Sequence, residues 1–274
     1  TFKFNAGGLY SEFHQLNVLP APSLVSFELN LDYPSYIGKE NQRLENTGEV
    51  LIPEGSNVRW DFFTKNTDTF NVLWGERLLN TKNTSKNHFS FFRTAKSSLN
   101  YTLLPFNSDV QTVDSVNYNF KVVKDGFPIV DVSELVDSTA LKTRYFQGQI
   151  KDDYGFSKLQ FVVKNPNNKW DSIVPIKINS SRNIETFFFV FDLKTIKINE
   201  GESLEYYFEV YDNDAVNGSK KSQSRAFEFN APTEEEIQQQ QEIKTKTLKK
   251  QLEQNVQLAK DLQEDFEDLR MKLL

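Results

Sequence analysis

The chain has 274 residues, a length that indicates two domains of roughly a hundred residues with an additional element. Its 32 basic and 38 acidic residues give a formal net charge of −6, so the chain lacks the basic surface expected of a nucleic-acid-binding protein. The absence of Cys excludes a disulfide scaffold, a thiol nucleophile and a thiolate metal site, while 24 Phe and 10 Tyr favour a mostly β protein.

The first element that we expect is a β-hairpin within residues 1–19. Its turn lies at Gly7-Gly8, and its strands carry alternating apolar residues, namely Phe2, Phe4, Phe13, Leu16 and Val18. The alternation is already under way at Thr1. We therefore expect residues 1–19 to be the closing hairpin of a preceding immunoglobulin-like domain whose earlier strands are missing from this fragment.

A segment that reads as two strands and ends at a proline occurs three times along the chain. The three segments end at Pro22, Pro128 and Pro232, with steps of roughly one hundred residues, the length of an immunoglobulin-type sandwich. The pattern predicts tandem immunoglobulin-like β-sandwiches at residues 20–124 and 125–231.

The interiors of the two copies also correspond. "VRWDFFTKNTDTFNVLW" aligns with "YFQGQIKDDYGFSKLQFVV", and "HFSFFRTAKSSLNYTLL" aligns with "TFFFVFDLKTIKINEGESLEYYF", each a strand, a polar turn and a strand. Alternation predicts the core faces. In the first copy these are Val58, Trp60, Phe62, Phe70, Val72 and Trp74. In the second copy they are Leu159, Phe161 and Val163, with Tyr207, Glu209 and Tyr211 alternating against Tyr206, Phe208 and Val210.

The tryptophans allow two interpretations. Trp60 and Trp74 lie on alternating strand faces and are expected in the core, the alternative being an exposed platform for stacking on a sugar. Trp170 follows the polar turn "NPNNK" and is the tryptophan whose exposure would favour glycan binding.

After Pro232 the pattern changes to that of one long helix over residues 232–274. Thr233 followed by Glu236 is a capping box, and no Gly or further Pro interrupts the segment. Apolar residues then recur at the spacing of a coiled coil, forming a seam of Leu248, Leu252, Asn255, Ala259, Leu262, Phe266, Leu269 and Leu273. We expect a partner helix from another chain or from a downstream part of this protein. The alternative is a solvated helix that lies partly on the second sandwich.

Two acidic stretches of the second copy are candidate ligand loops. "KDDYGFS" lies between its second and third strands and "YDNDAVNG" between its last two, so both are expected at the same end of the sandwich. Convergence would bring together Asp152, Asp153, Asp212 and Asp214, whose oxygens, with those of Asn213 and Asn217, suit calcium. Asp, Asn and Gly are also the residues that tight turns require, so turn chemistry is the competing interpretation.

Catalysis is not expected. Only His14 and His88 are present, which argues against a histidine-based triad or zinc site. No phosphate-binding glycine loop, GxSxG elbow or HExxH motif occurs, and loop tips of a small sandwich offer little burial to raise the pKa of a catalytic carboxylate. No stretch approaches the roughly 20 apolar residues of a membrane-spanning helix.

Three stretches resemble a known family. "LNLDYPSYIGKENQRLENTGEVLIPEGSNVRWDF", "DSTALKTRYFQGQIKDDYGFSKLQF" and "LEYYFEVYDNDAVNGSKKSQSRAFEF" are similar to an uncharacterised family of large bacterial envelope proteins. Its members carry N-terminal membrane helices, tandem Ig-like repeats and a long helical C-terminal region. The resemblance implies a membrane-anchored protein of the bacterial periplasm or cell envelope, and supplies no catalytic residue.

The function that these observations favour is a non-catalytic scaffold or spacer that uses its C-terminal helix for assembly with a protein partner or with itself. The alternative is a ligand-binding module that recognises cell-surface glycan through exposed aromatic residues or uses calcium at the acidic loops. An envelope hydrolase is a more distant third possibility.

Overall fold

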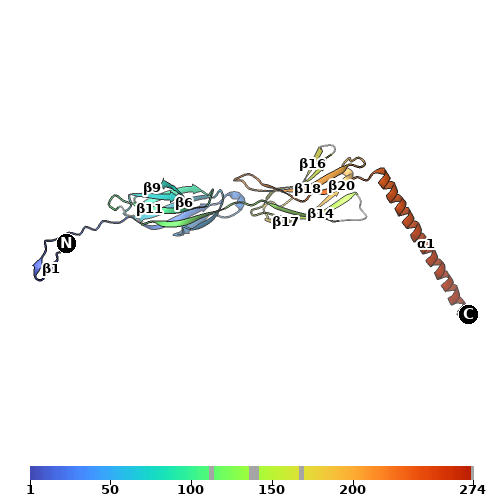
Figure 1. Ribbon diagram of the computed structural model, residues 1–274, viewed down its shortest axis with the longest axis horizontal. Helices are drawn as coiled ribbons and strands as arrows, with labels where there is room; N and C mark the ends of the chain where they lie inside the picture. Colours follow the sequence, from blue (N-terminus) through green and yellow to red (C-terminus); the bar gives the residue numbers. More distant parts are fainter. Residues whose placement is uncertain (111–113, 136–141, 167–169, 273–274) are drawn as a thin grey trace.

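The computed structural model describes residues 1–110, 114–135, 142–166 and 170–272. Its strands form two sandwiches that follow one another in a line, with a small hairpin at the N-terminal end and a long helix at the C-terminal end (Figure 1). The expected fold class, mostly β with one long C-terminal helix, is confirmed.

The first sandwich consists of two five-stranded sheets, ordered β4-β3-β6-β10-β9 and β5-β12-β11-β7-β8. A short 3-10 helix, η1 (Ser35–Ile37), lies between β3 and β4. The strands are β3 (Ser23–Asp32), β4 (Gln42–Glu45), β5 (Val50–Pro53), β6 (Asn57–Lys65), β7 (Thr69–Trp74), β8 (Arg77–Asn80), β9 (Lys82–Ser85), β10 (His88–Thr94), β11 (Leu99–Phe106) and β12 (Val116–Val123).

The second sandwich pairs a three-stranded sheet, β13-β14-β17, with a sheet ordered β16-β15-β18, whose last strand pairs along its other edge with both β19 and β20. A 3-10 helix, η2 (Leu193–Thr195), follows β17. The strands are β13 (Ile129–Leu135), β14 (Thr143–Lys151), β15 (Phe156–Asn165), β16 (Trp170–Ile176), β17 (Ile184–Asp192), β18 (Ser203–Asp212), β19 (Lys221–Gln223) and β20 (Phe227–Asn230).

The strand order is that of an immunoglobulin-like sandwich in both copies. In the first, β3, β6, β10 and β9 take the places of strands A, B, E and D, opposite β7, β11 and β12 in the places of C, F and G. In the second, β13, β14 and β17 correspond to A, B and E, opposite β15, β18 and the pair β19 and β20. The two alignments of strand pairs drawn from the sequence therefore match equivalent strands, β6-β7 with β14-β15 and β10-β11 with β17-β18.

The core of the first sandwich is aromatic. Trp60 is fully buried, which confirms its core placement, and it packs edge-on against the half-buried Trp74, with ring centroids 5.6 Å apart. Trp60 Nε1 donates a hydrogen bond to Tyr101 Oη over 3.3 Å, and Tyr101 Oη donates to the Gly48 carbonyl over 2.7 Å. The polar ends of both large side chains are thereby satisfied inside the core.

The core of the second sandwich is built mainly from phenylalanine. Phe161 and Phe208 face each other across β15 and β18, with centroids 5.0 Å apart, and Phe146 of the opposite sheet lies 5.2 Å from Phe208. The predicted core positions Leu159, Phe161 and Val163 are confirmed as buried, and on β18 the structure selects Tyr206, Phe208 and Val210 as the face that packs into the core. The opposite face of β18 is covered as well, since Glu209 accepts hydrogen bonds from Gln160, Tyr211 and Lys221.

Helix α1 (Glu234–Lys272) leads away from the second sandwich (Figure 1). The predicted capping box is present: Glu236 N donates to Thr233 Oγ1 and Thr233 N donates to Glu236 Oε2. At about 1.5 Å per residue, the 39 residues of α1 extend roughly 60 Å.

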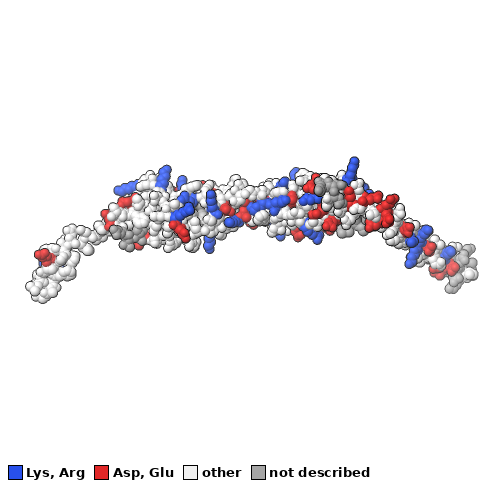
Figure 2. All heavy atoms as spheres, turned by 45° about the horizontal axis from the view of Figure 1, so that its top comes forward, with Lys and Arg blue, Asp and Glu red and all other residues white. Residues whose placement is uncertain are grey.

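The N-terminal segment forms a small exposed hairpin from β1 (Asn5–Ala6) and β2 (Leu9–Tyr10). Gly7 and Gly8 make the turn at positive φ, and a bridge between Phe2 and His14 continues the ladder. Very little charge is visible on this segment, whereas both signs are interspersed over the sandwiches (Figure 2). That the hairpin closes a further sandwich stays a prediction.

Candidate functional site

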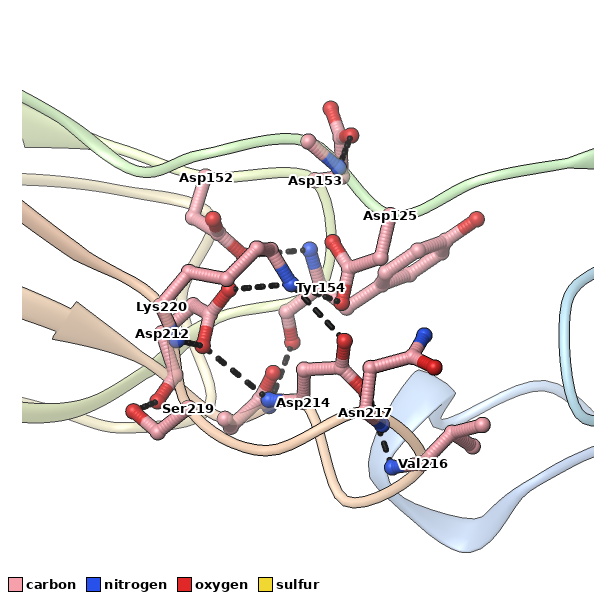
Figure 3. A network of polar contacts seen from close by, with 12 residues as sticks. Asp125, Asp152, Asp153, Tyr154, Asp212, Asp214, Val216, Asn217, Ser219 and Lys220 are labelled. Carbon is pink, nitrogen blue, oxygen red and sulfur yellow. Dashed lines mark hydrogen bonds and ion pairs between the residues drawn. The ribbon is translucent and has the colours of Figure 1, made fainter.

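The two acidic loops meet at the end of the second sandwich that faces the first sandwich (Figure 3). Residues 152–155 connect β14 to β15, and residues 213–220 connect β18 to β19. Asn213 Nδ2 donates to the Tyr154 carbonyl over 2.9 Å and so joins one loop to the other. The expectation that both loops emerge at the same end of the sandwich is confirmed.

Three carboxylates converge there, from Asp125, Asp152 and Asp212. One oxygen of each lies within 4.8 Å of the corresponding oxygen of the other two. The side chain of Asp212 is fully buried and that of Asp125 is 3% exposed. The three residues come from the segment between the sandwiches, from the loop after β14 and from the end of β18, so the group exists only in the folded chain.

Lys220 is the cation that the structure places beside this group. Its Nζ lies 2.7 Å from Asp212 Oδ2, 2.8 Å from Asp214 Oδ2 and 3.4 Å from Asp125 Oδ2. The backbone N–H of Lys220 also donates to Asp212 Oδ1 over 2.7 Å. One ammonium thus faces several buried or half-buried carboxylates, so negative charge exceeds positive charge at a site largely shielded from water.

The four acids expected from the sequence have different roles. Asp152 and Asp212 belong to the group of three, whereas Asp153 lies outside it, is exposed, and accepts from Gly126 N through Oδ2. Asp214 Oδ1 accepts from the backbone of Val216 and Asn217, which is the turn chemistry weighed above. Turn chemistry therefore accounts for Asp214, and calcium binding by the converging carboxylates stays a prediction.

Burial and local bonds perturb the pKa values of these groups. Burial raises the pKa of Asp125 to about 6, against the opposing attraction of Lys220. Burial also raises the pKa of Asp152, although two backbone N–H groups partly offset it. For Asp214, hydrogen bonds from Lys220, Asn217 and Val216 overcome the effect of burial and lower the pKa. Burial would lower the pKa of Lys220, but Asp212 and Asp214 overcome it and raise that pKa.

The loop after β18 also contacts the first sandwich. Asn213 Nδ2 lies 3.4 Å from the Tyr36 carbonyl, and Asn217 Nδ2 donates to Glu54 Oε2 over 3.2 Å. A Cβ on Gly55 would collide with the side chain of Val216, so a glycine at this positive-φ turn permits the close approach. The acidic group is therefore next to the junction between the sandwiches.

A ring contact crosses the same junction. Tyr36 of the first sandwich and Tyr154 of the second meet edge to face, with centroids 5.9 Å apart. Because Tyr154 immediately follows Asp153 in the β14–β15 loop, this contact joins the acidic end of the second sandwich to η1 of the first.

Trp170 is half-buried at the start of β16 and packs against the core of the second sandwich. Its backbone pairs with Asn165 of β15. Trp170 is therefore a partly buried packing residue on the edge strand of its sheet.

The expected seam of α1 lies open to solvent. Its large side chains are between 57% and 77% exposed, and none of them is part of either hydrophobic core; they are Leu248, Leu252, Leu262, Phe266 and Leu269. Asn255 and Ala259 are exposed in the same row, and Leu273 lies outside the described residues. The first turns of the helix, from Ile237 to Lys244, lie near Phe229 and Pro232 of the second sandwich, and Ile237 lines a cavity of about 470 Å³ there.

Two residues of the site were missed in the sequence. Asp125 stands in the junction "KDGFP", ahead of the first strand of the second sandwich, and in an immunoglobulin-like fold that strand starts at the end where the loops after β14 and β18 emerge. That rule would have identified Asp125. Lys220 was visible in "YDNDAVNGSKKS", but no sequence signal distinguishes its inward ammonium from that of neighbouring Lys221.

Comparisons with known proteins give no family. No family model matches the chain, and no curated protein matches its sequence. Solved structures match with low scores. Fibronectin(III)-like modules of CbhA from Clostridium thermocellum share 12% identity over 68% of this chain and 91% of that chain, with a TM-score of 0.25.

Two further solved structures are similar to this chain at the same level. The mouse nectin-like molecule 4 ectodomain, with domains Ig1–Ig3, shares 12% identity over 68% of this chain and 67% of that chain, with a TM-score of 0.28. A tetra-tandem repeat in the extending region of a large adhesion protein shares 8% identity over 77% of this chain and 67% of that chain, with a TM-score of 0.29. Such scores carry no argument about function, and the assignment of immunoglobulin-like sandwiches rests on the strand order above.

None of the helices within the described residues is both long enough and apolar enough to cross a membrane.

Proposed function

We propose that the chain is a non-catalytic spacer and scaffold module of a bacterial envelope protein, in which the two sandwiches set a distance and α1 makes the assembly contact. The observation that carries this proposal is the linear order of hairpin, sandwich, sandwich and a long helix with an exposed apolar seam (Figure 1). The extracytoplasmic location belongs to the same proposal and is supported by the sequence resemblance described above.

The junction between the sandwiches supports a spacer of restricted shape. Polar contacts from Asn213 and Asn217, the Tyr36–Tyr154 ring contact and the close approach of Val216 to Gly55 all join the two domains. Two sandwiches connected in several places bend less than two sandwiches connected by a linker alone.

The assembly contact that we propose is the pairing of α1 with α1 of a second copy in parallel register. The seam has Leu at alternate core positions, namely Leu248, Leu262 and Leu269, with Asn255 between them. In a parallel pair Asn255 meets Asn255 and the two amides bond each other, whereas against a wholly apolar partner each Asn would be buried without a partner. The exposed leucines and Phe266 would then be covered along the length of the helix.

The test is the mass of the full chain in solution, measured by sedimentation equilibrium over a range of concentrations. Wild type is expected to form a dimer, and Leu262→Asp with Leu269→Asp is expected to be monomeric, because each change places charge in the seam. The matched control is Gln254→Asp with Gln257→Asp, which adds the same charge on the opposite side of the helix. A wild-type chain that stays monomeric at all concentrations would refute self-assembly through α1.

The glycan-binding alternative has less support, because Trp170 packs against the second core and Trp60 and Trp74 belong to the first. A glycan array on the full chain provides the check: binding that Trp170→Ala abolishes would replace the spacer proposal with a lectin-like one.

A further inference from the structure

The buried polar atoms without hydrogen-bond partners are concentrated in one place. Among the described residues, the acidic junction contains Asp125 Oδ1 and Oδ2, Asp152 Oδ1, Asp212 Oδ2 and Asn213 Oδ1, of which Asp125 Oδ2 and Asp212 Oδ2 form ion pairs with Lys220. The remaining atoms of this kind, on His88, Arg144 and Tyr206, are scattered over both sandwiches. A native fold satisfies nearly all buried polar groups, so a cluster of exceptions requires a physical reason.

These five atoms are all oxygens that only accept. Lys220 Nζ lies 2.7 Å from Asp212 Oδ2 and 3.4 Å from Asp125 Oδ2, but Asp125 Oδ1 and Asp152 Oδ1 have neither a hydrogen bond nor an ion pair among the described residues. The Asp125 side chain is only 3% exposed, and its oxygens point toward those of the other two carboxylates (Figure 3). Burying carboxylates in this way is costly unless a cation joins them.

The spacing suits a single divalent cation. The three oxygens lie within 4.8 Å of one another, close enough for one ion to contact all three at the roughly 2.3 to 2.6 Å of a calcium–oxygen bond. Calcium accepts such a set of oxygens in a flexible geometry, whereas magnesium demands near-ideal octahedral geometry and usually keeps several waters. Carboxylate and amide oxygens also suit calcium better than they suit zinc or copper.

We infer that Asp125, Asp152 and Asp212 form a calcium site at the junction of the two sandwiches. Asn213, the next residue after Asp212, provides a further amide oxygen in the same loop. Turn chemistry alone does not account for the group, because the turn-forming bonds use Asp152 Oδ2 and Asp212 Oδ1 and leave the opposite oxygens free of them.

The ammonium of Lys220 lies among these carboxylates and can yield to the metal without losing every partner. Its ammonium also binds Asp214 Oδ2 at 2.8 Å, and Asp214 is not one of the three converging carboxylates. Calcium would replace Lys220 beside Asp125 and Asp212 while Lys220 keeps Asp214. The side chain thus provides a single charge that holds the loop together before the metal arrives.

Calcium at this place would stiffen the spacer. Asp125 lies in the segment between the sandwiches, and Asn213 and Asn217 of the adjoining loop contact Tyr36 and Glu54 of the first sandwich. A metal that ties Asp125 to both loops restricts the one segment about which the sandwiches can bend. The site therefore links ion binding to the reach of the module.

The experiment is isothermal titration calorimetry, in which calcium chloride alone is titrated into the full 274-residue chain. The protein is first treated with EDTA and then freed of EDTA. Wild type is expected to bind one calcium, and its thermal transition is expected to rise by several degrees in millimolar calcium. Asp125→Asn should weaken the affinity at least about tenfold, because it removes a charged ligand. The matched control is Asp153→Asn, which removes a neighbouring carboxylate outside the group and should bind as wild type does.

A second variant guards against a folding defect. Asp152→Asn keeps an oxygen for the Tyr154 and Gly155 N–H groups, so the turn persists while a charged ligand is lost, and it should weaken calcium binding as Asp125→Asn does. Absence of a calcium signal in wild type up to millimolar concentration would overturn the inference. So would equal binding by wild type and both ligand variants, or an equal response to magnesium.

The inference is independent of the assembly role of α1. The Leu262→Asp, Leu269→Asp variant should bind calcium with wild-type affinity, so failure of the dimer and failure of the metal site are read from separate measurements.

Discussion

Replacing Lys220 by Met tests whether the ammonium holds the acidic junction together. The substitution keeps the length and the apolar stem of the side chain and leaves the backbone bonds between residues 212 and 220 in place. It removes the ion pairs of 2.7 Å and 2.8 Å to Asp212 and Asp214, whose side chains are both 0% exposed. Asp125, 3% exposed, loses its neighbour at 3.4 Å as well.

The expected cost follows from leaving buried carboxylates without a cation. Removing one partner of a buried ion pair destabilises a protein by about 3 to 5 kcal/mol. For a domain of about a hundred residues, that corresponds to a fall in the unfolding temperature of roughly 15 to 30 °C. The loss should be confined to the second sandwich, because the core of the first contains none of these residues.

The assay is differential scanning calorimetry of the full chain in EDTA, so that no divalent ion replaces the ammonium. The matched control is Lys158→Met, an exposed lysine of the same sandwich whose ammonium lies over the Tyr211 ring, and its expected cost is under about 1 kcal/mol. A double-mutant cycle with Asp214→Asn should show a coupling of more than about 0.5 kcal/mol. A change of under about 2 °C in Lys220→Met would refute the argument that the junction depends on this charge.

Further predictions concern single side chains. Tyr101→Phe should destabilise the first sandwich by about 2 to 4 kcal/mol, measured by the same calorimetry, because Trp60 Nε1 and the Gly48 carbonyl lose their hydrogen-bond partner. The control is Tyr118→Phe, whose hydroxyl has no hydrogen bond among the described residues, and it should cost under about 1 kcal/mol. Burial would raise the pKa of Glu209, but hydrogen bonds led by that of Lys221 overcome burial and lower this pKa in the folded protein. The ionised carboxylate therefore stabilises the fold at pH values above its unfolded pKa of about 4.3, and this stabilisation is lost as the pH falls through the lower folded pKa. The free energy of unfolding, measured with urea from about pH 7 to pH 3, should depend less on pH in Glu209→Gln than in wild type. Thr233→Ala should weaken the start of α1 by about 1 kcal/mol, seen as faster amide exchange in its first turn, and unchanged exchange there would contradict the role of the cap.

Local patterns were sufficient to predict the fold class. Alternation along β6, β7 and β15 identified core residues such as Trp60 and Phe161, because a strand with one buried face must repeat every second residue. The capping box at Thr233 identified the start of α1, because it is a contact between residues three apart. Repetition of the pattern at the length of one sandwich indicated two copies.

The acidic site illustrates what local patterns do not contain. Loop placement predicted that Asp152 and Asp212 converge. In the structure the third carboxylate of the group is neither Asp153 nor Asp214 but Asp125, which lies 27 residues before Asp152 in the sequence. Adjacent residues such as Asp152 and Asp153 point in different directions, and only the packing of the loops decides which carboxylate turns inward.

The strands, the long helix and their order follow from the amino-acid pattern, because they depend on periodicity and on contacts between near neighbours. Which oxygens are buried together, the approach of Lys220 to them, and the contacts of this group with Tyr36 and Glu54 of the first sandwich become visible only in the folded chain. Those features arise from the meeting of segments far apart in the chain, whose relative positions are set by how two sheets and two domains pack, and no spacing within one segment encodes that packing.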